Sequence, residues 1–367
     1  MNAFRYGLFG VGRIGCIHGR LVKGQGARIA AIGDENPDAI AAARARLGEP
    51  DAPAHADAGE MSAAGGLDGV IIASHTSDHA RHALPFVEAG IPVYVEKPLA
   101  ADLPGAFDFV AGVGTGRTLI QAGLQRRYDP ALVHAKQVIE EGLIGAVREI
   151  RSVLRDRVPS PPSFASGGIF PDIGIHVADE AVWLLDEHPD TIRAQVHWAK
   201  ESGINTGEGG NTAFVTFTTA SGTIGRLDLS RTHASGYNNE TYVIGTRGTL
   251  HVGRFSGYPG PIPVEVWTEG GLLHPRSRTF GMATMPGEDA EFLPRFHDAY
   301  GGAHRAFREA VESGRPFAVT QNEALDAQVF AEAADRSART GGDPVRFRRS
   351  DHLGEYRRLC ADAGLLA

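Results

Sequence analysis

Three residues of types that move protons and charge lie in two short segments of this 367-residue sequence. Lys97 stands between a glutamate and a proline, while Asp172 and His176 are four positions apart. At the start of a helix, that spacing puts both side chains on one face. A carboxylate beside an imidazole holds its tautomer and raises its basicity, which equips His176 to take a proton. An N-capping aspartate, a core or surface histidine and a structural lysine are the alternative interpretations.

A glycine-rich motif stands near the start of the chain. Gly10, Gly12 and Gly15 form a GxGxxG pattern that includes Arg13 and Ile14, directly after an apolar run and at the opening of a helical pattern. We expect the first glycine to permit a tight turn, the second to admit a pyrophosphate to the backbone amides, and the third to let helix and strand pack closely. An ordinary turn between strand and helix is the alternative.

Asp34 ends the second apolar run of the chain, and Glu35 follows it without an arginine in the next few residues. A carboxylate at this place accepts hydrogen bonds from the adenosine ribose hydroxyls and repels a 2′-phosphate, so the pattern predicts NAD rather than NADP. A role for Asp34 in capping the loop before Pro37 is the alternative. The further cofactor-binding candidates lie at the ends of the expected strands Gly69–Ser74 and Val93–Val95 or shortly after them: Ser74, Thr76, His79, Glu96 and Lys97.

The N-terminal third of the chain alternates short apolar runs with helical patterns. The runs are Arg5–Gly10, Arg28–Gly33, Gly69–Ser74 and Val93–Val95, and the helical patterns are Arg13–Val22, Pro37–Leu47 and Asp78–Ala89. This alternation predicts an α/β domain with a parallel, doubly wound Rossmann sheet, which we assign to residues 1–122. Lys97 then emerges at the carboxyl edge of the sheet, where a nicotinamide is expected.

The periodicity changes after about Gln121. Consecutive strand-like runs joined by turns predict an α+β domain with a large, mostly antiparallel sheet over residues 123–367, for substrate binding and oligomerisation. This assignment allows the late helices of residues 123–367 to pack against the first domain. The expected strands are Thr191–Trp198, Thr212–Phe217, Gly222–Ser230, Glu240–Ile244 and Thr249–Val252. The expected helices are Pro130–Glu141, His176–Leu185, Arg295–Ser313 and Asn322–Arg339, and Ser256–Pro263 is interpreted as an ordered loop.

Composition excludes several classes of protein. A formal net charge of -8 without a basic run argues against a nucleic-acid or anionic membrane partner, and the apolar stretches have only strand length. The two cysteines, Cys16 and Cys360, cannot form a disulfide framework, and no signal-peptide pattern follows Met1, so we expect a cytoplasmic protein. No metal is expected, because no HxxxH or CxxC spacing accompanies His176.

The glycine motif, the aspartate after the second strand and the Glu96-Lys97-Pro98 run together resemble the Gfo/Idh/MocA oxidoreductase family over essentially the whole chain. The segment Gly167–His176, with Asp179 three positions on, is similar to the GGxxxDxGxH motif that supplies the catalytic pair in the family's inositol dehydrogenases. The resemblance implies that His176 takes the hydroxyl proton as hydride leaves the same carbon, with Asp172 beside it. Lys97 then hydrogen-bonds the reacting oxygen.

Three further segments resemble the inositol dehydrogenases of that family: Gln125–Asp129 with its RRYD run, Arg155–Arg157 with the prolines that follow, and the Gly236–Asn238 turn. The resemblance implies a pocket rich in hydrogen-bonding groups, suited to a neutral ring with many hydroxyls, with inositol as the first choice. It also implies a homo-oligomer, either a dimer or a tetramer. The candidate substrate-binding residues are Lys97, Gln125, Arg127, Asp156, Asp172, His176 and Tyr237.

The sequence leaves alternatives open. Val177, His75 and Gln125 depart from the subgroup's usual residues, so an aldose such as L-glucose, or another pyranose oxidised at C1 to its lactone, is an alternative substrate. A keto-sugar or anhydro-sugar reductase is expected to prefer NADP, against which Asp34 argues. A non-catalytic nucleotide-sensing regulator is expected to lack part of the catalytic set, which this chain retains. The polar residues of a late helix are interpreted as surface or packing: His297, Asp298, Tyr300 and His304.

Overall fold

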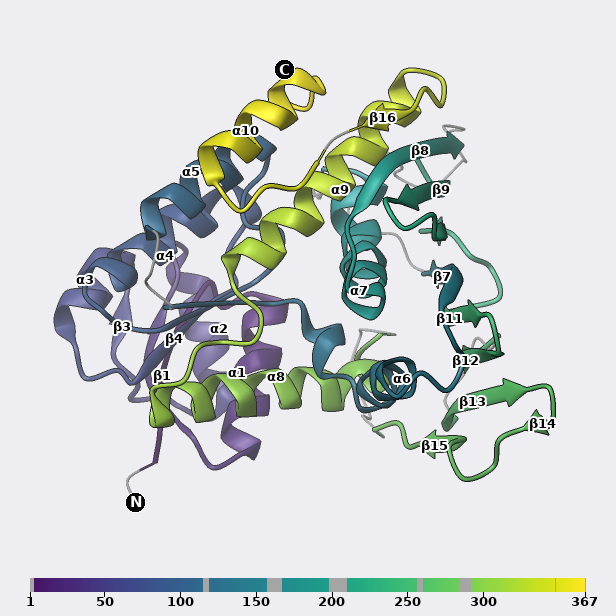
Figure 1. The fold of residues 1–367 in the computed structure, drawn as a ribbon. Coiled ribbons are helices and arrows are strands. Elements are labelled where there is room, and N and C mark those ends of the chain that lie inside the picture. The colour runs from purple at the N-terminus through teal and green to yellow at the C-terminus, as the bar shows by residue number, and fades with distance from the viewer. Residues whose placement is uncertain are drawn as a thin grey trace. The chain divides into compact units, whose positions relative to one another are not determined.

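The computed structural model describes residues 3–366, apart from 115–118, 157–166, 198–209, 256–259, 284–291 and 347. The chain divides into two compact units (Figure 1). The first unit consists of Met1–Gln125 and Tyr300–Leu325, and the second of Arg126–Ala299 and Asp326–Ala367. Each unit therefore contains a segment from the late helices of the chain.

The first unit is built on a six-stranded sheet in the order β3-β2-β1-β4-β5-β6, in which every pair is parallel. The strands are β1 (Arg5–Phe9), β2 (Arg28–Gly33), β3 (Ala54–His55), β4 (Gly69–Ile72), β5 (Val93–Val95) and β6 (Ile120–Ala122). The helices are α1 (Arg13–Gly24), α2 (Pro37–Leu47), α3 (Ala58–Ala64), α4 (His79–Glu88) and α5 (Leu103–Val113). The strand order changes direction between β1 and β4, which is where such sheets bind nucleotides.

Helices cover both faces of this sheet. Figure 1 shows α1 and α2 on one side of the strands and α3, α4 and α5 on the other. Strands covered on both faces carry continuous apolar runs, and Leu8, Ile71 and Val95 are accordingly almost wholly buried. The predicted doubly wound Rossmann sheet is thus confirmed. The strands β3 and β6, of two and three residues, were not predicted from the sequence.

The second unit is built on a large mixed sheet in the order β14-β13-β12-β11-β7-β10-β9-β8-β16, with β15 paired to β13. Its strands are β7 (Val147–Arg155), β8 (Pro189–His197), β9 (Thr212–Thr219), β10 (Ile224–Ser230), β11 (Asn238–Gly245), β12 (Gly248–Arg254), β13 (Ile262–Thr268), β14 (Gly271–Leu272), β15 (Arg278–Phe280) and β16 (Val345–Arg346). The β7–β10 pair is parallel and the other pairs are antiparallel. The expectation of a mostly antiparallel sheet is confirmed.

One face of the second sheet is covered by helices. The helices of this part of the chain are α6 (Pro130–Glu140), α7 (Ile175–Leu185), α8 (Leu293–Ser313), α9 (Gln321–Arg339) and α10 (Leu353–Asp362). α6 packs on β12 and β13, and α7 on β7 and β10. The residues of β9 alternate between buried and exposed positions, and Phe214 is 41% exposed on the uncovered side. Such alternation is typical of a sheet with one open face.

The second unit differs from expectation in several elements. The strands β13 to β16 and the helix α10 were not predicted. β7 was not predicted either, although it lies at the centre of the sheet. The interpretation of Ser256–Pro263 as a loop is wrong for its last two residues, because Ile262 and Pro263 belong to β13. Residues 256–259, and Trp198 of the first expected strand, lie outside the described residues.

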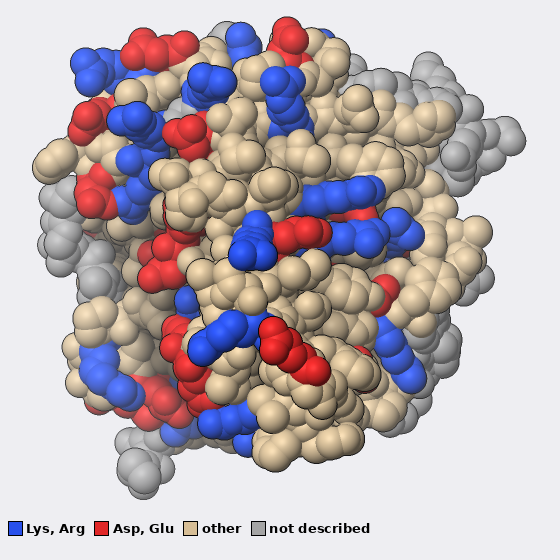
Figure 2. All heavy atoms as spheres, turned by 45° about the vertical axis from the view of Figure 1, so that its right-hand side comes forward, with Lys and Arg blue, Asp and Glu red and all other residues tan. Residues whose placement is uncertain are grey.

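The surface of the described residues mixes both signs of charge. On the face drawn in Figure 2, the Lys and Arg side chains are interspersed with Asp and Glu side chains among uncharged residues. Within the described ranges, no helix has both the length and the apolar content needed to cross a membrane.

Candidate active site

The glycine loop between β1 and α1 is shaped by close backbone contacts. Gly10 has a φ of 84°, and a Cβ there would lie 2.2 Å from the backbone nitrogen of Ser74. A Cβ at Gly15 would lie 2.0 Å from the carbonyl oxygen of Gly10. Gly12, which caps α1 without a side-chain hydrogen bond, faces open space, with no atom within 4 Å of a Cβ built there. The loop thus presents the amino end of a helix to an open region, which suits a pyrophosphate.

Asp34, at the end of β2, is tied to this loop. Its Oδ2 accepts a hydrogen bond of 2.9 Å from the backbone N–H of Val11, and its Oδ1 accepts one of 2.9 Å from Asn36. Asp34 therefore caps the loop before Pro37, as the alternative interpretation of this residue predicts. A carboxylate has about four lone-pair directions, so two backbone donors leave acceptor capacity for ribose hydroxyls.

Lys97 follows β5, and both neighbouring residues are held by buried histidines of the first unit. His18 of α1 contacts Glu96 Oε1 through Nε2 at 3.0 Å, and His79 of α4 contacts the Pro98 carbonyl through Nδ1 at 2.8 Å. The other nitrogen of His79 lies 3.1 Å from the Ser74 carbonyl. Burial lowers the pKa of His79, so its neutral ring donates to one of these two carbonyls at a time.

The remaining cofactor candidates of the first unit lie around the same strand ends. Ser74 Oγ is 2.8 Å from Nδ1 of His82, and Thr76 opens a short 3-10 helix that ends at Asp78. Arg13 and Ile14 form the first turn of α1. These positions agree with a nucleotide site at the carboxyl edge of the sheet, where the sequence placed them.

In the second unit, the parallel β7–β10 pair brings several polar residues to one edge of the sheet. Arg155 pairs with Ser230, so both strands end side by side and release Asp156 and Arg231 at the same edge. The backbone N–H of Asp156 donates to the Ser230 carbonyl at 2.8 Å. β11 begins opposite the end of β7, with Asn238 paired to Arg155. The topology therefore places the turn before β11 beside Asp156 and Arg231.

Tyr237 stands in that turn. Burial raises the pKa of Tyr237 above its usual range, and the Asp156 carboxylate raises it further, while the guanidinium groups of Arg126 and Arg295 act in the opposite direction. The pairing of Asn238 with Arg155 places Tyr237 and Asp156 at adjoining positions, just beyond the ends of two neighbouring strands. Tyr237 and Asp156, both predicted from sequence, are thus neighbours in the second unit.

Asp172 lies in a turn of π-helix, Phe170–Gly174, and His176 in the first turn of α7. The Asp172 carboxylate faces Arg231, with Oδ2 3.5 Å from Nη1, and both side chains are largely buried. Burial lowers the pKa of Arg231 and the Asp172 carboxylate raises it. Whether Asp172 also orients His176 stays a prediction. Arg231 links Asp172 to the edge that carries Asp156.

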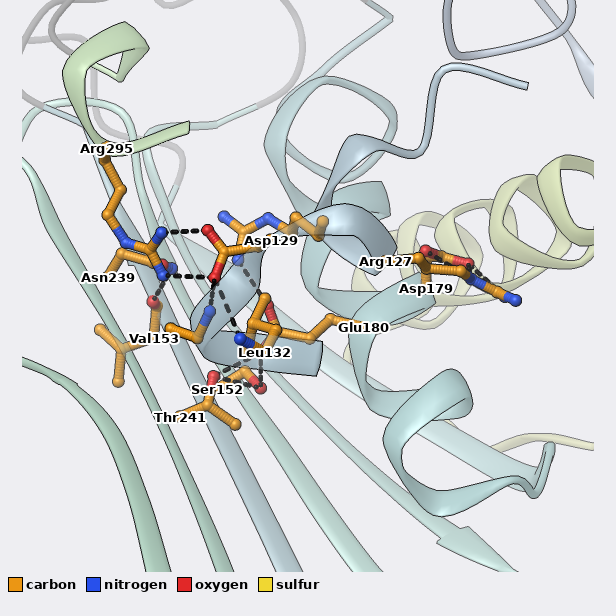
Figure 3. Close-up of polar contacts among 12 residues, drawn as sticks. Arg127, Asp129, Leu132, Ser152, Val153, Asp179, Glu180, Asn239, Thr241 and Arg295 are labelled. Atoms are coloured by element: carbon orange, nitrogen blue, oxygen red, sulfur yellow. Dashed lines mark hydrogen bonds and ion pairs between the residues drawn. The ribbon is translucent and has the colours of Figure 1, made fainter. Parts of the chain in front are cut away.

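The RRYD run is engaged in buried ion pairs (Figure 3). Arg127 binds Asp179 through two nitrogens, with Nη2 2.6 Å from Oδ1. Arg126 Nη1 is 2.6 Å from Glu180 Oε2, and both of these side chains are buried. Figure 3 shows the Arg127–Asp179 pair apart from the group around Glu180. Because the Asp179 carboxylate accepts hydrogen bonds from Arg127, at most part of the N–H groups of Arg127 can bind a substrate.

Glu180 and Asp129 are further anchors of the same region. Ser152 Oγ donates to Glu180 Oε1 at 3.2 Å, and Thr241 Oγ1 donates to the same oxygen. Asp129 is bonded to Arg295 of α8. Gln125, the other pocket candidate in this run, is 3% exposed and belongs to the first unit. Of the RDPAPP-like segment, residues 157–166 lie outside the described residues.

The polar residues of α8 separate into two kinds. His297 and Asp298 contact each other at 3.1 Å on the surface. Tyr300 and His304 are buried in the first unit. Surface and packing, as expected, account for both kinds, except that His304 also takes part in a buried polar contact described below.

Sequence reasoning missed three site neighbours: Arg231, His18 and Asp179 as a partner of Arg127. Arg231 follows β10 directly, and its importance depends on the parallel pairing with β7, which no local pattern revealed. His18 stands eight residues after Gly10 on a buried helix face, where a histidine carries no motif of its own. Only its contact with Glu96 shows its place.

The first unit has a Rossmann sheet with this glycine loop and carboxylate, and the second is an α+β unit that carries an aspartate, a histidine and buried arginines. Together these features define the class of nicotinamide-dependent dehydrogenases. Residues 4–120 match a family model described as an oxidoreductase family with an NAD-binding Rossmann fold. Residues 132–251 match the model of the GFO/IDH/MocA C-terminal domain. The chain belongs to the GFO/IDH/MocA oxidoreductase family, and its cofactor is NAD.

Relatives of known name narrow the group. The chain is 31% identical to the inositol 2-dehydrogenase of Rhizobium meliloti over 91% of this chain and 96% of the relative. It is 28% identical to the myo-inositol 2-dehydrogenase of Thermotoga maritima, again over 91% and 96%. A crystal structure of scyllo-inositol dehydrogenase from Lactobacillus casei, with NAD(H) and scyllo-inositol bound, superposes with a TM-score of 0.79 at 25% identity, covering 94% of this chain and 99% of the other. The resemblance inferred from the motifs is confirmed.

Proposed function

We propose that this protein is an NAD-dependent dehydrogenase that oxidises one ring hydroxyl of an inositol to the corresponding inosose. The observation that carries the proposal is the convergence of three strand ends, where Asp156 follows β7, Arg231 follows β10 and Tyr237 precedes β11. Such a group of polar residues favours a neutral ligand with many hydroxyls over an apolar one. Several relatives over nine-tenths of the chain are named inositol 2-dehydrogenases, whereas none of those compared above is named for an aldose.

The chemistry requires removal of a proton and a hydride from one carbinol group. When bound, NAD accepts the hydride. In the proposal, His176 takes the hydroxyl proton, and its neighbour Asp172 stabilises the imidazolium that results. Lys97 hydrogen-bonds the same oxygen and stabilises the negative charge that develops on it. Arg231, 3.5 Å from Asp172, holds that carboxylate in place while the proton moves.

The other ring hydroxyls need partners of their own. We assign the substrate to Asp156 and Tyr237 at the sheet edge, together with Gln125 and Arg127. A hydroxyl bonded to a carboxylate donates, and one bonded to an arginine or a tyrosine hydroxyl accepts. The mixture suits a ring in which every carbon carries a group that does both.

The test is a spectrophotometric screen of NAD reduction over myo-, scyllo- and chiro-inositol and a set of D- and L-aldoses. We expect NADH formation with at least one inositol, at a kcat/KM well above that of every aldose. An aldose with the highest kcat/KM, and a lactone as its product, would overturn the choice of inositol while leaving the reaction class intact. No turnover of any ring alcohol would overturn the proposed function itself.

We also propose that a second copy of the chain covers the open face of the second sheet. Large apolar side chains stand exposed along β9 to β13, including Ile224 at 56% and Trp267 at 45%. The same face carries both signs of charge, with Arg226 and Arg151 bonded to Asp228, and Glu240 bonded to His251. A face that presents apolar and both charged groups can pair with itself about a two-fold axis. Light scattering of the wild type and of Ile224→Glu tests this, because the variant is expected to be monomeric.

The compartment is proposed to be the cytoplasm. Cys16 and Cys360 are both buried free thiols, which agrees with a reducing environment. Fractionation of the producing cells, followed by immunodetection, checks this assignment, and recovery in a secreted or periplasmic fraction would contradict it.

A further inference from the structure

Three buried polar side chains of the first unit form a continuous contact behind Lys97. Nδ1 of His18 lies 2.8 Å from Nε2 of His304, and Nε2 of His18 lies 3.0 Å from Oε1 of Glu96. His18 and His304 are wholly buried, and Glu96 is 7% exposed. The three residues come from α1, α8 and the end of β5. We call them the His304–His18–Glu96 array.

The hydrogen-bonding rules allow one economical placement of protons in this array. An ionised carboxylate only accepts, so Nε2 of His18 carries the proton and donates to Glu96. Nδ1 of neutral His18 then accepts, so Nε2 of His304 donates to it. This leaves Nδ1 of His304 without a proton, and among the described residues that atom has no hydrogen-bond partner. In this placement both rings carry their proton on Nε2, and the one unpaired ring nitrogen, Nδ1 of His304, is an acceptor.

The opposite placement is costly. A cationic His18 would donate to both neighbours, and His304 would then keep its proton on the buried Nδ1, where no described residue accepts it. Nδ1 of His304 is unpaired in either placement, but the cationic one also puts a second charge into the buried array, and a single ion pair does not fully offset the desolvation of both charges. Burial lowers the pKa of His304 well below its ordinary value, so the His304 ring is neutral in either placement. The rings of Tyr94 and Tyr300 lie 5.4 and 5.5 Å from His18 and exclude water from its sides.

Glu96 connects His18 to the backbone of Lys97. Its Oε2 accepts from the backbone N–H of Lys97 at 3.3 Å, while its own N–H donates to the Ile72 carbonyl of β4 at 3.0 Å. Gly123, at the end of β6, leaves room for the carboxylate, because a Cβ there would lie 2.8 Å from Oε1. The carboxylate is therefore fixed on one side by His18 and on the other by the peptide that carries Lys97.

We propose that His18 is a positioning residue for Lys97, acting through Glu96, and that His304 sets the tautomer in which it does so. The array ends at a buried nitrogen, so it does not conduct a proton to solvent. Its effect is geometric: it holds the backbone of Lys97 where the amine meets the reacting oxygen. This inference deepens the proposed function and rests on Lys97 acting in that reaction.

The first experiment determines where the protons of the array lie and does not depend on turnover. ¹⁵N-histidine NMR of the NAD-free protein reports the tautomer of each ring, and His18→Gln and His304→Gln assign the two signals by their loss. We expect both His18 and His304 to be neutral Nε2–H tautomers at pH 7. A cationic His18, or an Nδ1–H tautomer of His304, would overturn the proposed proton placement.

The second experiment uses variants that differ in one donor. His18→Leu removes the bond to Glu96, and a misplacement of about 1 Å at Lys97 lowers kcat about 100-fold. His18→Gln keeps an N–H near the position of Nε2, and we expect its kcat to stay within about fivefold of the wild type, with KM within about threefold for both variants. Leu21→Ala, on the same helix and buried, is the packing control. It loses a comparable amount of thermal stability and keeps its kcat.

Two results contradict the positioning role. Wild-type kcat in His18→Leu, or a loss in His18→Gln as large as in His18→Leu, shows that the bond to Glu96 does not act on Lys97. If His18→Leu does not fold, His304→Leu against His304→Gln repeats the comparison one residue further out. Failure of the proposed function is distinguishable, because the wild type then lacks turnover with every ring alcohol while the NMR reading still decides the array.

Discussion

The binding regions of the two units are shaped by different parts of the chain. In the first, the cofactor loop is shaped by missing side chains: Gly10 and Gly15 approach other backbone atoms so closely that no Cβ fits. In the second, the sheet edge is shaped by long charged side chains, such as Arg231 and Arg126, each bonded to a carboxylate. Backbone geometry serves a cofactor that many enzymes share, whereas side chains serve a substrate that differs among enzymes. The difference predicts where substitutions alter chemistry, stability, cofactor choice or substrate.

The largest effect is expected where the proposed chemistry takes place. Lys97→Ala and His176→Ala should each lower kcat about 1,000-fold or more, because each removes a proton-transfer or charge-stabilising group. NAD affinity, measured by quenching of tryptophan fluorescence, should change little. Lys136→Ala, on α6 and paired with the exposed Glu140, is the matched control and should keep wild-type turnover. Substantial activity in both variants would end the proposed mechanism.

The second unit should lose the most stability when one of its buried pairs is broken. Glu180→Gln leaves Arg126 buried without its charge partner, and such a change costs about 3–5 kcal/mol. Urea unfolding followed by circular dichroism measures the loss. The exposed carboxylate of Glu140 gives the control, because Glu140→Gln should cost about 0.5 kcal/mol or less. Equal midpoints for the two variants would show that the buried pair is not an anchor.

Cofactor choice should follow one carboxylate of the first unit. Asp34→Ser removes the acceptor for the ribose hydroxyls and the charge that repels a 2′-phosphate, so the preference for NAD over NADP should fall about 100-fold. The ratio of kcat/KM for the two cofactors measures it. Glu35→Gln, one position on and exposed, should leave the ratio nearly unchanged. A wild-type enzyme with a lower KM for NADP than for NAD would refute the reading of Asp34.

The smallest effect is expected from a substitution that keeps charge and changes shape. Arg231→Lys retains a cation near Asp172 but loses the planar fork, which should lower kcat/KM about tenfold. Arg247→Lys, whose partner is a carbonyl in an exposed turn, is the control. An unchanged kcat/KM in Arg231→Lys would show that charge alone, without geometry, supports Asp172.

The same difference between the two units determines which features could be predicted from the sequence. The turn around Gly10 and the strand that ends at Asp34 are local, so spacing along the chain was enough to predict them. The edge at Asp156 and Tyr237 was indicated by resemblance, but its partner Arg231 was missed. That residue becomes a neighbour only through the parallel pairing of β7 with β10, which are far apart in sequence. His18 was missed for the same reason, since its partners lie on β5 and α8.

The parallel β7–β10 pair has a further consequence, for the order of folding. β7 pairs with β10 in parallel, so the chain between them must fold back before their bonds form, and such non-local pairing is slow. Hairpins such as β9–β10 and β11–β12 join neighbouring segments and can form early. The edge that carries Asp156 and Arg231 is therefore completed late.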